Sequence, residues 1–343
     1  MRKVIYHSVI GKAIFYTVIL CSLIKVNGMN CYPSLFFFPA NFSAFFTSVF
    51  QPANDSLIYL KKITQLANAD KSGRWPPVTV MPQKGAIIPF KRVIAFYGNF
   101  FCPQMGILGE YKASVMLQKL RVQLKEWEKA DPTTPVVPAL HYIAVTAQRN
   151  ACDGYYRLRM PDSEITKAIQ LADSVNGIVF LDIQIGLSTL QSELPRLTKF
   201  LKLNNVHLAI DPEFSMKSAK KPGTSIGTLD AADVNYAMDL LANIVKEHHI
   251  PPKILVVHRF TSEMLTNYKN IITRPEVQVV INMDGFGSPV LKKSTYHYFI
   301  YRQPVQFTGF KVFYKNDVKT GGRIMNPAEI LALQPQPVYI QYQ

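Results

Sequence analysis

Two short apolar runs decide the fold of this chain: Gly177-Ile-Val-Phe-Leu-Asp-Ile-Gln184 and Val206-His-Leu-Ala-Ile-Asp-Pro-Glu213, separated by a helical pattern over 188–203. Continuously apolar runs of this length are typical of strands that are buried on both faces of a parallel sheet. A strand, a helix and a second strand in this order predict a βαβ unit with parallel strands. Each run ends in polar residues, which indicates where a functional site is to be sought.

The alternation of predicted strands and helices continues on both sides of this unit. Further strands are predicted over 92–98, 135–144, 253–258, 277–284, 305–314 and 337–343. Further helices are predicted over 107–130, 162–175, 230–248, 288–301 and 326–333, and one is predicted to start near Thr261. Eight strands alternating with seven helices over about 250 residues predict an α/β protein of the (β/α)8 TIM-barrel type whose last helix is missing. A doubly wound open sheet is the alternative, although the Gly-x-Gly-x-x-Gly nucleotide fingerprint of that fold is absent.

The chain before the barrel, which spans 91–343, divides into two segments. Residues 1–28 carry four basic and no acidic residues, and 13–24 are uncharged, which is the pattern of a signal peptide or of an uncleaved membrane anchor. Residues 29–90 are predicted to form an N-terminal arm that wraps the barrel, covers the gap left by the missing helix or lies on a membrane surface. We therefore expect a secreted or cell-envelope protein, anchored in the membrane if the first segment stays uncleaved.

The composition excludes several classes of protein. Hydrophobic residues make up 48% and charged residues 18%, so the chain is not disordered as a whole, and 4 Cys are too few for a disulfide-stapled scaffold. Export would permit a disulfide between Cys102 and Cys152, which follow neighbouring strands. The net charge of +15 predicts an anionic partner, such as a polysaccharide or another anionic envelope polymer. Nucleic acid is not expected as a partner, because no known binding module is present.

Polar side chains gather where the predicted strands end, and barrels of this type build their active sites at that end. The alternation of side chains along a strand puts Asp182 with Gln184, and Asp211 with Glu213, on shared faces. Crowded acids in apolar surroundings have raised pKa values and can form an acid–base pair. The candidate catalytic residues are Glu213, Asp182, Asp211 and Asp284. The candidate substrate-binding residues are Tyr97, His141, Gln184, His258, Asn282 and Lys311.

No cofactor and no metal ion is expected from the sequence. The first strand lacks His-x-His, and neither His-Glu-x-x-His nor Cys-x-x-Cys occurs in the chain. The Gly-x-Ser-x-Gly nucleophile elbow is also absent. A lone histidine at a strand end is compatible with a structural role, and an Asp in such a position can cap the next helix.

Four segments carry a resemblance to known proteins: Phe180–Gly186, Leu208–Phe214, Val256–Phe260 and Asn282–Gly287. Over roughly 92–343 the chain resembles an uncharacterised family of exported bacterial proteins with a (β/α)8-barrel-like layout. More loosely, it is similar to (β/α)8 glycoside hydrolases, and this similarity implies carboxylate chemistry at the strand ends. The commonest arrangement in those enzymes has one acid after strand four and another after strand seven. Here strand seven ends in Tyr314-Lys-Asn-Asp317, without an obvious inward-facing acid.

Two hypotheses of function follow. The first is an exported glycoside hydrolase in which Glu213 is the general acid, Asp182 or Asp284 its partner, and Asp211 raises the pKa of Glu213. In this hypothesis His258 and Tyr97 orient the sugar or the acid.

The second hypothesis is a non-catalytic cell-envelope protein that binds a glycan or an acidic polymer on the same face. The positive net charge, the aromatic-rich stretch Leu35–Phe46 before the barrel and the missing strand-seven acid favour it. Two carboxyl groups facing each other across an open pocket would favour hydrolysis. Acids that cap helices or pair with Lys311 and Arg259 would favour binding.

Overall fold

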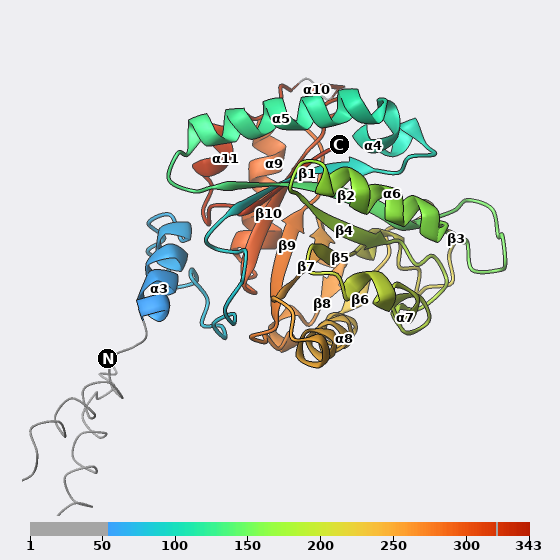
Figure 1. Cartoon of the computed structure of the whole chain (residues 1–343), viewed down its shortest axis with the longest axis horizontal. Coiled ribbons are helices and arrows are strands. Elements are labelled where there is room, and N and C mark those ends of the chain that lie inside the picture. The colour runs from blue at the N-terminus through green and yellow to red at the C-terminus, as the bar shows by residue number, and fades with distance from the viewer. Residues whose placement is uncertain (1–53, 320–321) are drawn as a thin grey trace, which may run out of the picture. The chain divides into compact units, whose positions relative to one another are not determined.

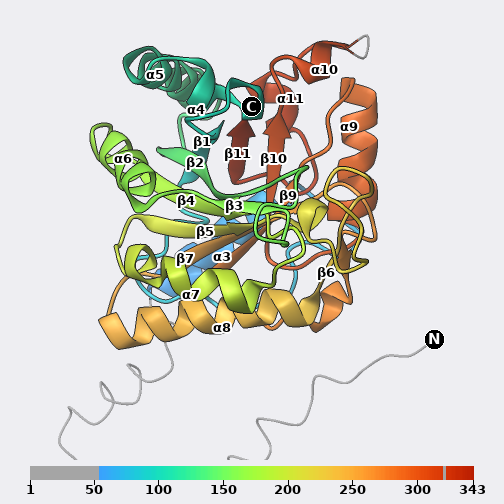
Figure 2. The ribbon, with the colours of Figure 1, turned by 90° about the vertical axis from the view of Figure 1, so that its right-hand side faces the viewer.

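A closed barrel of eight parallel strands forms the body of the protein (Figures 1 and 2). The computed structural model describes residues 54–319 and 322–343, so the predicted leader 1–28 and the first part of the arm lie outside the described residues. The barrel strands are β1 (Arg92–Gly98), β2 (Val136–Ala147), β4 (Ile178–Ile183), β5 (Val206–Ile210), β7 (Lys253–Arg259), β9 (Val277–Met283), β10 (Phe307–Val312) and β11 (Tyr339–Tyr342). The barrel closes because β1 pairs in parallel with both β2 and β11. The predicted (β/α)8 TIM barrel is confirmed, and the open sheet is wrong.

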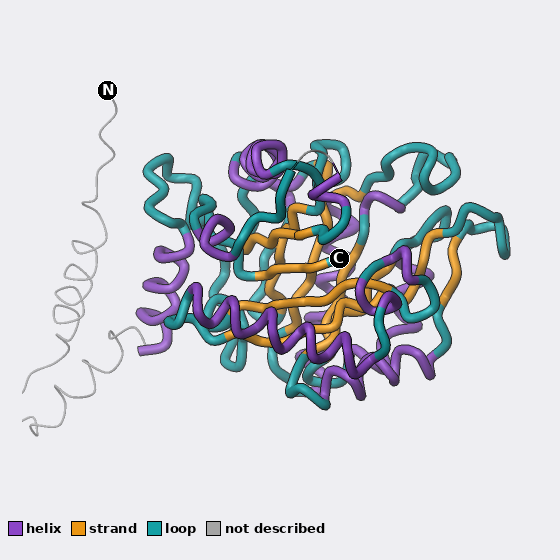
Figure 3. The backbone as a smooth tube through the Cα atoms, turned by 90° about the horizontal axis from the view of Figure 1, so that it is seen from above, coloured by secondary structure: helices purple, strands orange, loops and turns teal. Residues whose placement is uncertain are grey.

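Helices surround the strands, as the view along the barrel in Figure 2 and the view from above in Figure 3 show. They are α4 (Ile107–Glu110), α5 (Ala113–Ala130), α6 (Asp162–Asp173), α7 (Leu190–Leu201), α8 (Ala231–His248), α9 (Pro289–Tyr296), α10 (Asn316–Lys319) and α11 (Pro327–Leu331). The predicted helix 107–130 is broken into α4 and α5, because Tyr111 adopts an extended backbone conformation. No helix in the described part of the chain is long and apolar enough to cross a membrane.

Alternating residues of each strand face either the barrel interior or the helices. The inward set includes Val93 and Ala95 of β1, together with Phe180 of β4, whereas Ile94 and Phe96 of β1 pack with the helices. All of these side chains are buried, because the parallel strands are covered on both faces. This double burial is the physical reason why the strands are apolar without alternation in the sequence.

The end of the barrel where the strands begin is covered by α3 (Asn54–Leu66) and the segment that follows it (Figure 1). Tyr59 is buried among the inward-facing barrel residues. The side chain of Gln278, at the start of β9, binds both the backbone N–H and the carbonyl of Ile88. The gap left by the missing last helix is covered differently: α5 contacts α11, and Trp127 of α5 donates a 2.8 Å hydrogen bond to Tyr342 of β11. The described part of the arm, residues 54–90, therefore packs against the end of the barrel where the strands begin.

The helix predicted to start near Thr261 is absent. Arg259, which is almost fully buried, donates hydrogen bonds to the carbonyls of Thr261, Ser262 and Leu265 at 3.1–3.2 Å. These carbonyls would accept the intrahelical hydrogen bonds if a helix formed here. The loop instead adds the short strand β8 (Leu265–Thr266), which pairs with β6 (Leu229–Asp230).

We expect Arg259→Leu to destabilise the protein by about 3 kcal/mol, because it leaves the buried carbonyl of Leu265 and the partly buried carbonyls of Thr261 and Ser262 without this donor. The loss would appear as a lower midpoint in thermal or urea unfolding followed by circular dichroism. An unchanged midpoint would show that the guanidinium does not hold the 259–265 loop.

The disulfide predicted between Cys102 and Cys152 does not form. Both residues are free cysteines; Cys102 is half-buried and Cys152 is exposed. The prediction rested on neighbouring loops, but β3 (Arg157–Arg159) turns back along β2 as an antiparallel strand and carries the second loop outward.

Candidate functional site

A cavity of about 580 Å³ opens at the end of the barrel where the strands finish. Six of the ten predicted site residues line it: Tyr97, Gln184, Asp211, Glu213, Asp284 and Lys311. The other four are fully buried and do not line it: His141, Asp182, His258 and Asn282. All ten lie on or directly after barrel strands, so the strand-end pattern brings them to one end of the fold. Their depth along the barrel separates the residues that can touch a ligand from those beneath the cavity floor.

One wall of the cavity is aromatic. Phe214, Phe260, Phe286 and Phe313 contribute to it, and the ring of Phe286 is 53% exposed. Phe286 packs edge-on against Phe313, with 5.9 Å between the ring centroids. Aromatic faces of this kind suit the apolar face of a sugar ring. Phe260 and Phe313 were not predicted from the sequence, and each directly follows an observed strand, β7 and β10.

Glu213 reaches the cavity because the chain turns sharply after β5. Asp211 ends the strand, Pro212 starts the 3-10 helix η2 (Pro212–Phe214), and the Asp211 carboxylate accepts a 3.0 Å hydrogen bond from the backbone N–H of Glu213. In the described part of the chain, no hydrogen bond or ion pair reaches the Glu213 carboxyl group. Burial, reinforced by the charge of Asp284, raises the pKa of Glu213 to about 7. Glu213 therefore keeps its proton at mildly acidic pH.

Asp284 has the opposite electrostatic environment. Its two oxygens contact Lys311 Nζ at 2.9 Å and His258 Nδ1 at 3.1 Å. Burial opposes ionisation of Asp284, but these two cations outweigh it and hold its pKa below the ordinary value. The same cavity thus contains one carboxyl group that retains its proton and one carboxylate that does not. Such a pair is the usual mark of an acid and its partner.

Asp211, the third acid that lines the cavity, is held by a hydrogen bond from Gln184. Gln184 Nε2 donates to Asp211 at 3.2 Å and to the Tyr97 hydroxyl at 3.3 Å, which ties three strands together. Burial raises the pKa of Asp211 well above its ordinary value. The charge that raises the pKa of Glu213 comes from Asp284, whereas the sequence hypothesis assigned this effect to Asp211.

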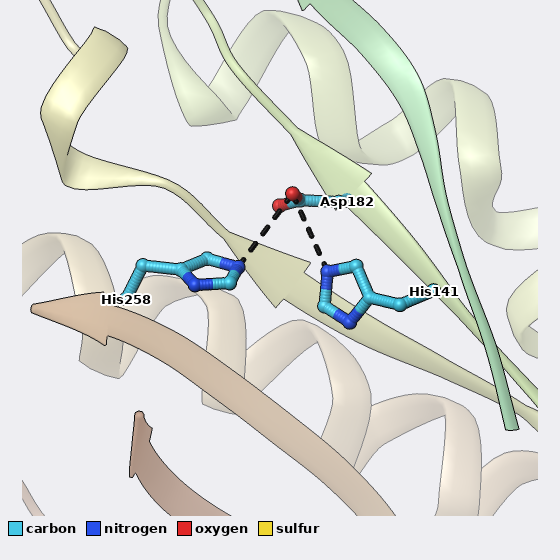
Figure 4. Close-up of side chains that lie close together, drawn as sticks. All are labelled: His141, Asp182 and His258. Atoms are coloured by element: carbon cyan, nitrogen blue, oxygen red, sulfur yellow. Dashed lines mark ion pairs between the residues drawn. The ribbon is translucent and has the colours of Figure 1, made fainter. Parts of the chain in front are cut away.

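Beneath the cavity floor, His141, Asp182 and His258 form a compact cluster (Figure 4). Asp182 Oδ2 lies 3.3 Å from His141 Nε2 and 3.6 Å from His258 Nε2, and all three side chains are fully buried. One ligand atom from each residue lies within 4.8 Å of the other two, so this group could hold a metal ion. Burial lowers the pKa of His141 to about 4. Burial works in the same direction at His258, but the charges of Asp284 and Asp182 prevail and raise its pKa to about 10.

Two residues of the last strand complete this buried layer and were missed from the sequence. The Tyr339 hydroxyl lies 2.6 Å from His141 Nδ1, and Gln341 Nε2 donates to the same hydroxyl at 3.1 Å. Their spacing of two residues, on a strand of a closed barrel, is the signal that could have found them. Gly309 makes room for them, because a Cβ at this position would approach the side chains of Asn282 and Tyr339 to 2.6 and 3.0 Å.

The chain has remote similarity to two solved structures. No protein-family model matches the chain, and no curated protein matches it. Among solved structures, the chain is similar to one named as the cellulase Cel5C_n, with a TM-score of 0.41 and 10% identity over 74% of this chain and 75% of the other. It is also similar to the dihydropteroate synthase of Burkholderia cenocepacia complexed with 7,8-dihydropteroate, with a TM-score of 0.36 and 12% identity over 74% of this chain and 86% of the other. Similarities this remote identify no activity.

Proposed function

We propose that the protein is an exported glycoside hydrolase that cleaves a polysaccharide of the cell envelope or its surroundings. The observation that supports this proposal is the pair of Glu213 and Asp284, which line one cavity and whose pKa values are shifted in opposite directions. Hydrolysis of a glycosidic bond requires one protonated and one ionised carboxyl group. Asp182, the other partner considered from the sequence, is fully buried and does not line the cavity.

In the proposed reaction, Glu213 gives its proton to the glycosidic oxygen as the bond to the anomeric carbon breaks. Asp284 supplies the electron pair on the opposite side, either by attacking the anomeric carbon or by taking a proton from an attacking water. In the first case, the ionised Glu213 then accepts a proton from the water that releases the sugar. Lys311 and His258 keep Asp284 ionised, and the phenylalanine wall supports the sugar ring.

The direct test is a screen of the full-length protein against neutral and anionic polysaccharides, with release of reducing ends as the readout. Product formation that disappears in Glu213→Gln would support the proposal. The absence of product from every glycan that binds the cavity would contradict it.

The pH dependence provides a second test. Because Glu213 must be protonated and its pKa is raised to about 7, kcat/KM is expected to be highest below this pH. Above it, kcat/KM should fall about tenfold per pH unit, as expected for a single essential acid. A pH series of initial rates checks this, with circular dichroism at each pH to confirm that the fold is retained. A rate that rises through pH 7 would contradict the assignment of Glu213 as the acid.

Binding without catalysis is the second candidate function, and a specific observation favours it. Asp211 caps η2, and Asp284 already pairs with Lys311, so two of the acids have structural partners. In this case a glycan would bind to the doubly substituted Glu213→Gln/Asp284→Asn protein as tightly as to the wild type. The wild type would then release no product at any pH.

A further inference from the structure

We infer that His141, Asp182 and His258 form a binding site for one divalent transition-metal ion, with Zn²⁺ as the best-suited ion. The proposal goes beyond the hydrolase assignment and does not depend on it, because the three side chains lie beneath the cavity and do not line it. Each ligand comes from a different barrel strand: β2, β4 and β7. The metal would lie on the inside of the barrel, at the level of Asp182.

The two contacts of Asp182 with the histidines fit ligands of a shared metal better than direct hydrogen bonds. Charge-assisted N–H···O hydrogen bonds are about 2.7–2.9 Å long. The contacts of Asp182 Oδ2 with the two imidazole Nε2 atoms are longer, at 3.3 and 3.6 Å. Zinc bonds to imidazole and carboxylate are about 2.0–2.2 Å, so neighbouring ligands of a tetrahedral ion lie roughly 3.3–3.6 Å apart. The observed contacts fall in this interval.

The three facing atoms also lack other partners. His141 Nε2, His258 Nε2 and Asp182 Oδ2 are buried and have no hydrogen-bond partner of adequate geometry among the described residues. A buried polar atom without a hydrogen-bond partner costs free energy of folding. A ligand that contacts all three atoms would remove this cost. A single cation at the centre would do so.

The polar atoms of the three side chains that face away from the centre have hydrogen-bond partners, as is usual for metal ligands. His258 Nδ1 faces Asp284 at 3.1 Å, which gives a carboxylate–histidine pair directed at the centre. Because a carboxylate can only accept, Nδ1 of His258 carries a hydrogen, and a bound metal would take the place of the proton on Nε2. His141 Nδ1 lies 2.6 Å from the Tyr339 hydroxyl, and Asp182 Oδ1 accepts from the backbone N–H of Ile183 at 2.9 Å.

Tyr97 separates this site from the cavity. Its ring centroid lies 5.2 Å from that of His141 and 6.2 Å from that of His258, and Tyr97 also lines the cavity. A metal ion in the site is therefore screened from solvent, and we expect it to be incorporated during folding and to exchange slowly. For this reason the experiment loads the metal during expression.

The experiment expresses the full chain in defined medium supplemented with ZnCl₂ and measures zinc per chain by mass spectrometry after desalting. We expect about one equivalent in the wild type and at least a tenfold loss of zinc in Asp182→Asn and in His258→Gln. His207→Gln is the matched control, because His207 is equally buried in the same barrel but belongs to no such cluster. It should retain the zinc, as should the double variant His248→Gln/His249→Gln, which removes the adjacent histidines at the C-terminal end of α8.

Wild-type protein without zinc, or Asp182→Asn that holds as much zinc as the wild type, would overturn the inference. The cluster would then bind protons and no metal ion. Zinc lost only with His248 and His249 would overturn it as well. If the cluster variants do not fold, Co²⁺-loaded wild type decides: visible d–d absorption that disappears in Zn²⁺-supplemented cultures supports the site, and its absence overturns it. Because every readout is metal content or spectrum, failure here leaves the test of hydrolysis unaffected.

Discussion

Glu213→Gln is expected to lower kcat on a polysaccharide by about 10²–10⁴-fold, the usual contribution of a general acid. The amide keeps the size of the side chain but has no proton to give to the leaving oxygen. The fold should survive, because in the described part of the chain no hydrogen bond or ion pair depends on this carboxyl group. Initial rates and a thermal melt of the same preparation measure both effects.

The nature of the leaving group gives this prediction its specificity. A substrate whose leaving group needs no proton, such as a dinitrophenyl glycoside, should be much less affected by Glu213→Gln than the natural glycan. The matched control is Glu276→Gln: this carboxylate is also largely buried but pairs with Lys246 at the other end of the barrel. An equal loss on both substrates would show that Glu213 binds or positions the sugar and does not protonate it.

The barrel could be predicted from the sequence because its strands are buried on both faces. Double burial requires continuous apolar runs, and the helices between them set the spacing. The order of strands and helices could therefore be predicted without knowledge of tertiary contacts. The exception is the loop after β7: its helix was predicted from spacing, but the buried Arg259 takes up the carbonyls that such a helix needs. A single side chain that competes for backbone carbonyls leaves no periodic signal.

The site could be predicted only as a set of strand ends. Asp182 and Asp284 look equivalent in the sequence, since each ends an apolar run, yet Asp182 lies within β4 and Asp284 lies just past the end of β9. That difference in depth puts one beneath the cavity floor and the other on its wall. Depth depends on the register between strands, which the order of residues does not reveal. The same limit hid the cluster of His141, Asp182 and His258, whose members come from three separate strands.

Asp284→Asn is expected to abolish hydrolysis to a similar extent as Glu213→Gln, about 10²–10⁴-fold in kcat, because the amide neither attacks the anomeric carbon nor takes a proton from water. The substitution should also change the pKa of the general acid, Glu213. The charge of Asp284 helps to raise the pKa of Glu213 to about 7. Without this charge the pKa of Glu213 falls, so the residual activity should decline at a lower pH than in the wild type. A pH series on the variant, with high enzyme concentration, measures this shift.

The shift separates a catalytic pair from two independent acids. Asp131→Asn is the matched control, because Asp131 also forms a 2.9 Å ion pair, with Arg92, but at the end of the barrel where the strands begin. It should lower stability and leave the pH profile in place. Because Asp284→Asn also removes the carboxylate partner of Lys311 and His258, its thermal midpoint should fall as well, and rates are compared below that midpoint. Residual activity that declines at an unchanged pH would mean that the two carboxyl groups do not act on one another, and the acid–base assignment would fail even if kcat were low.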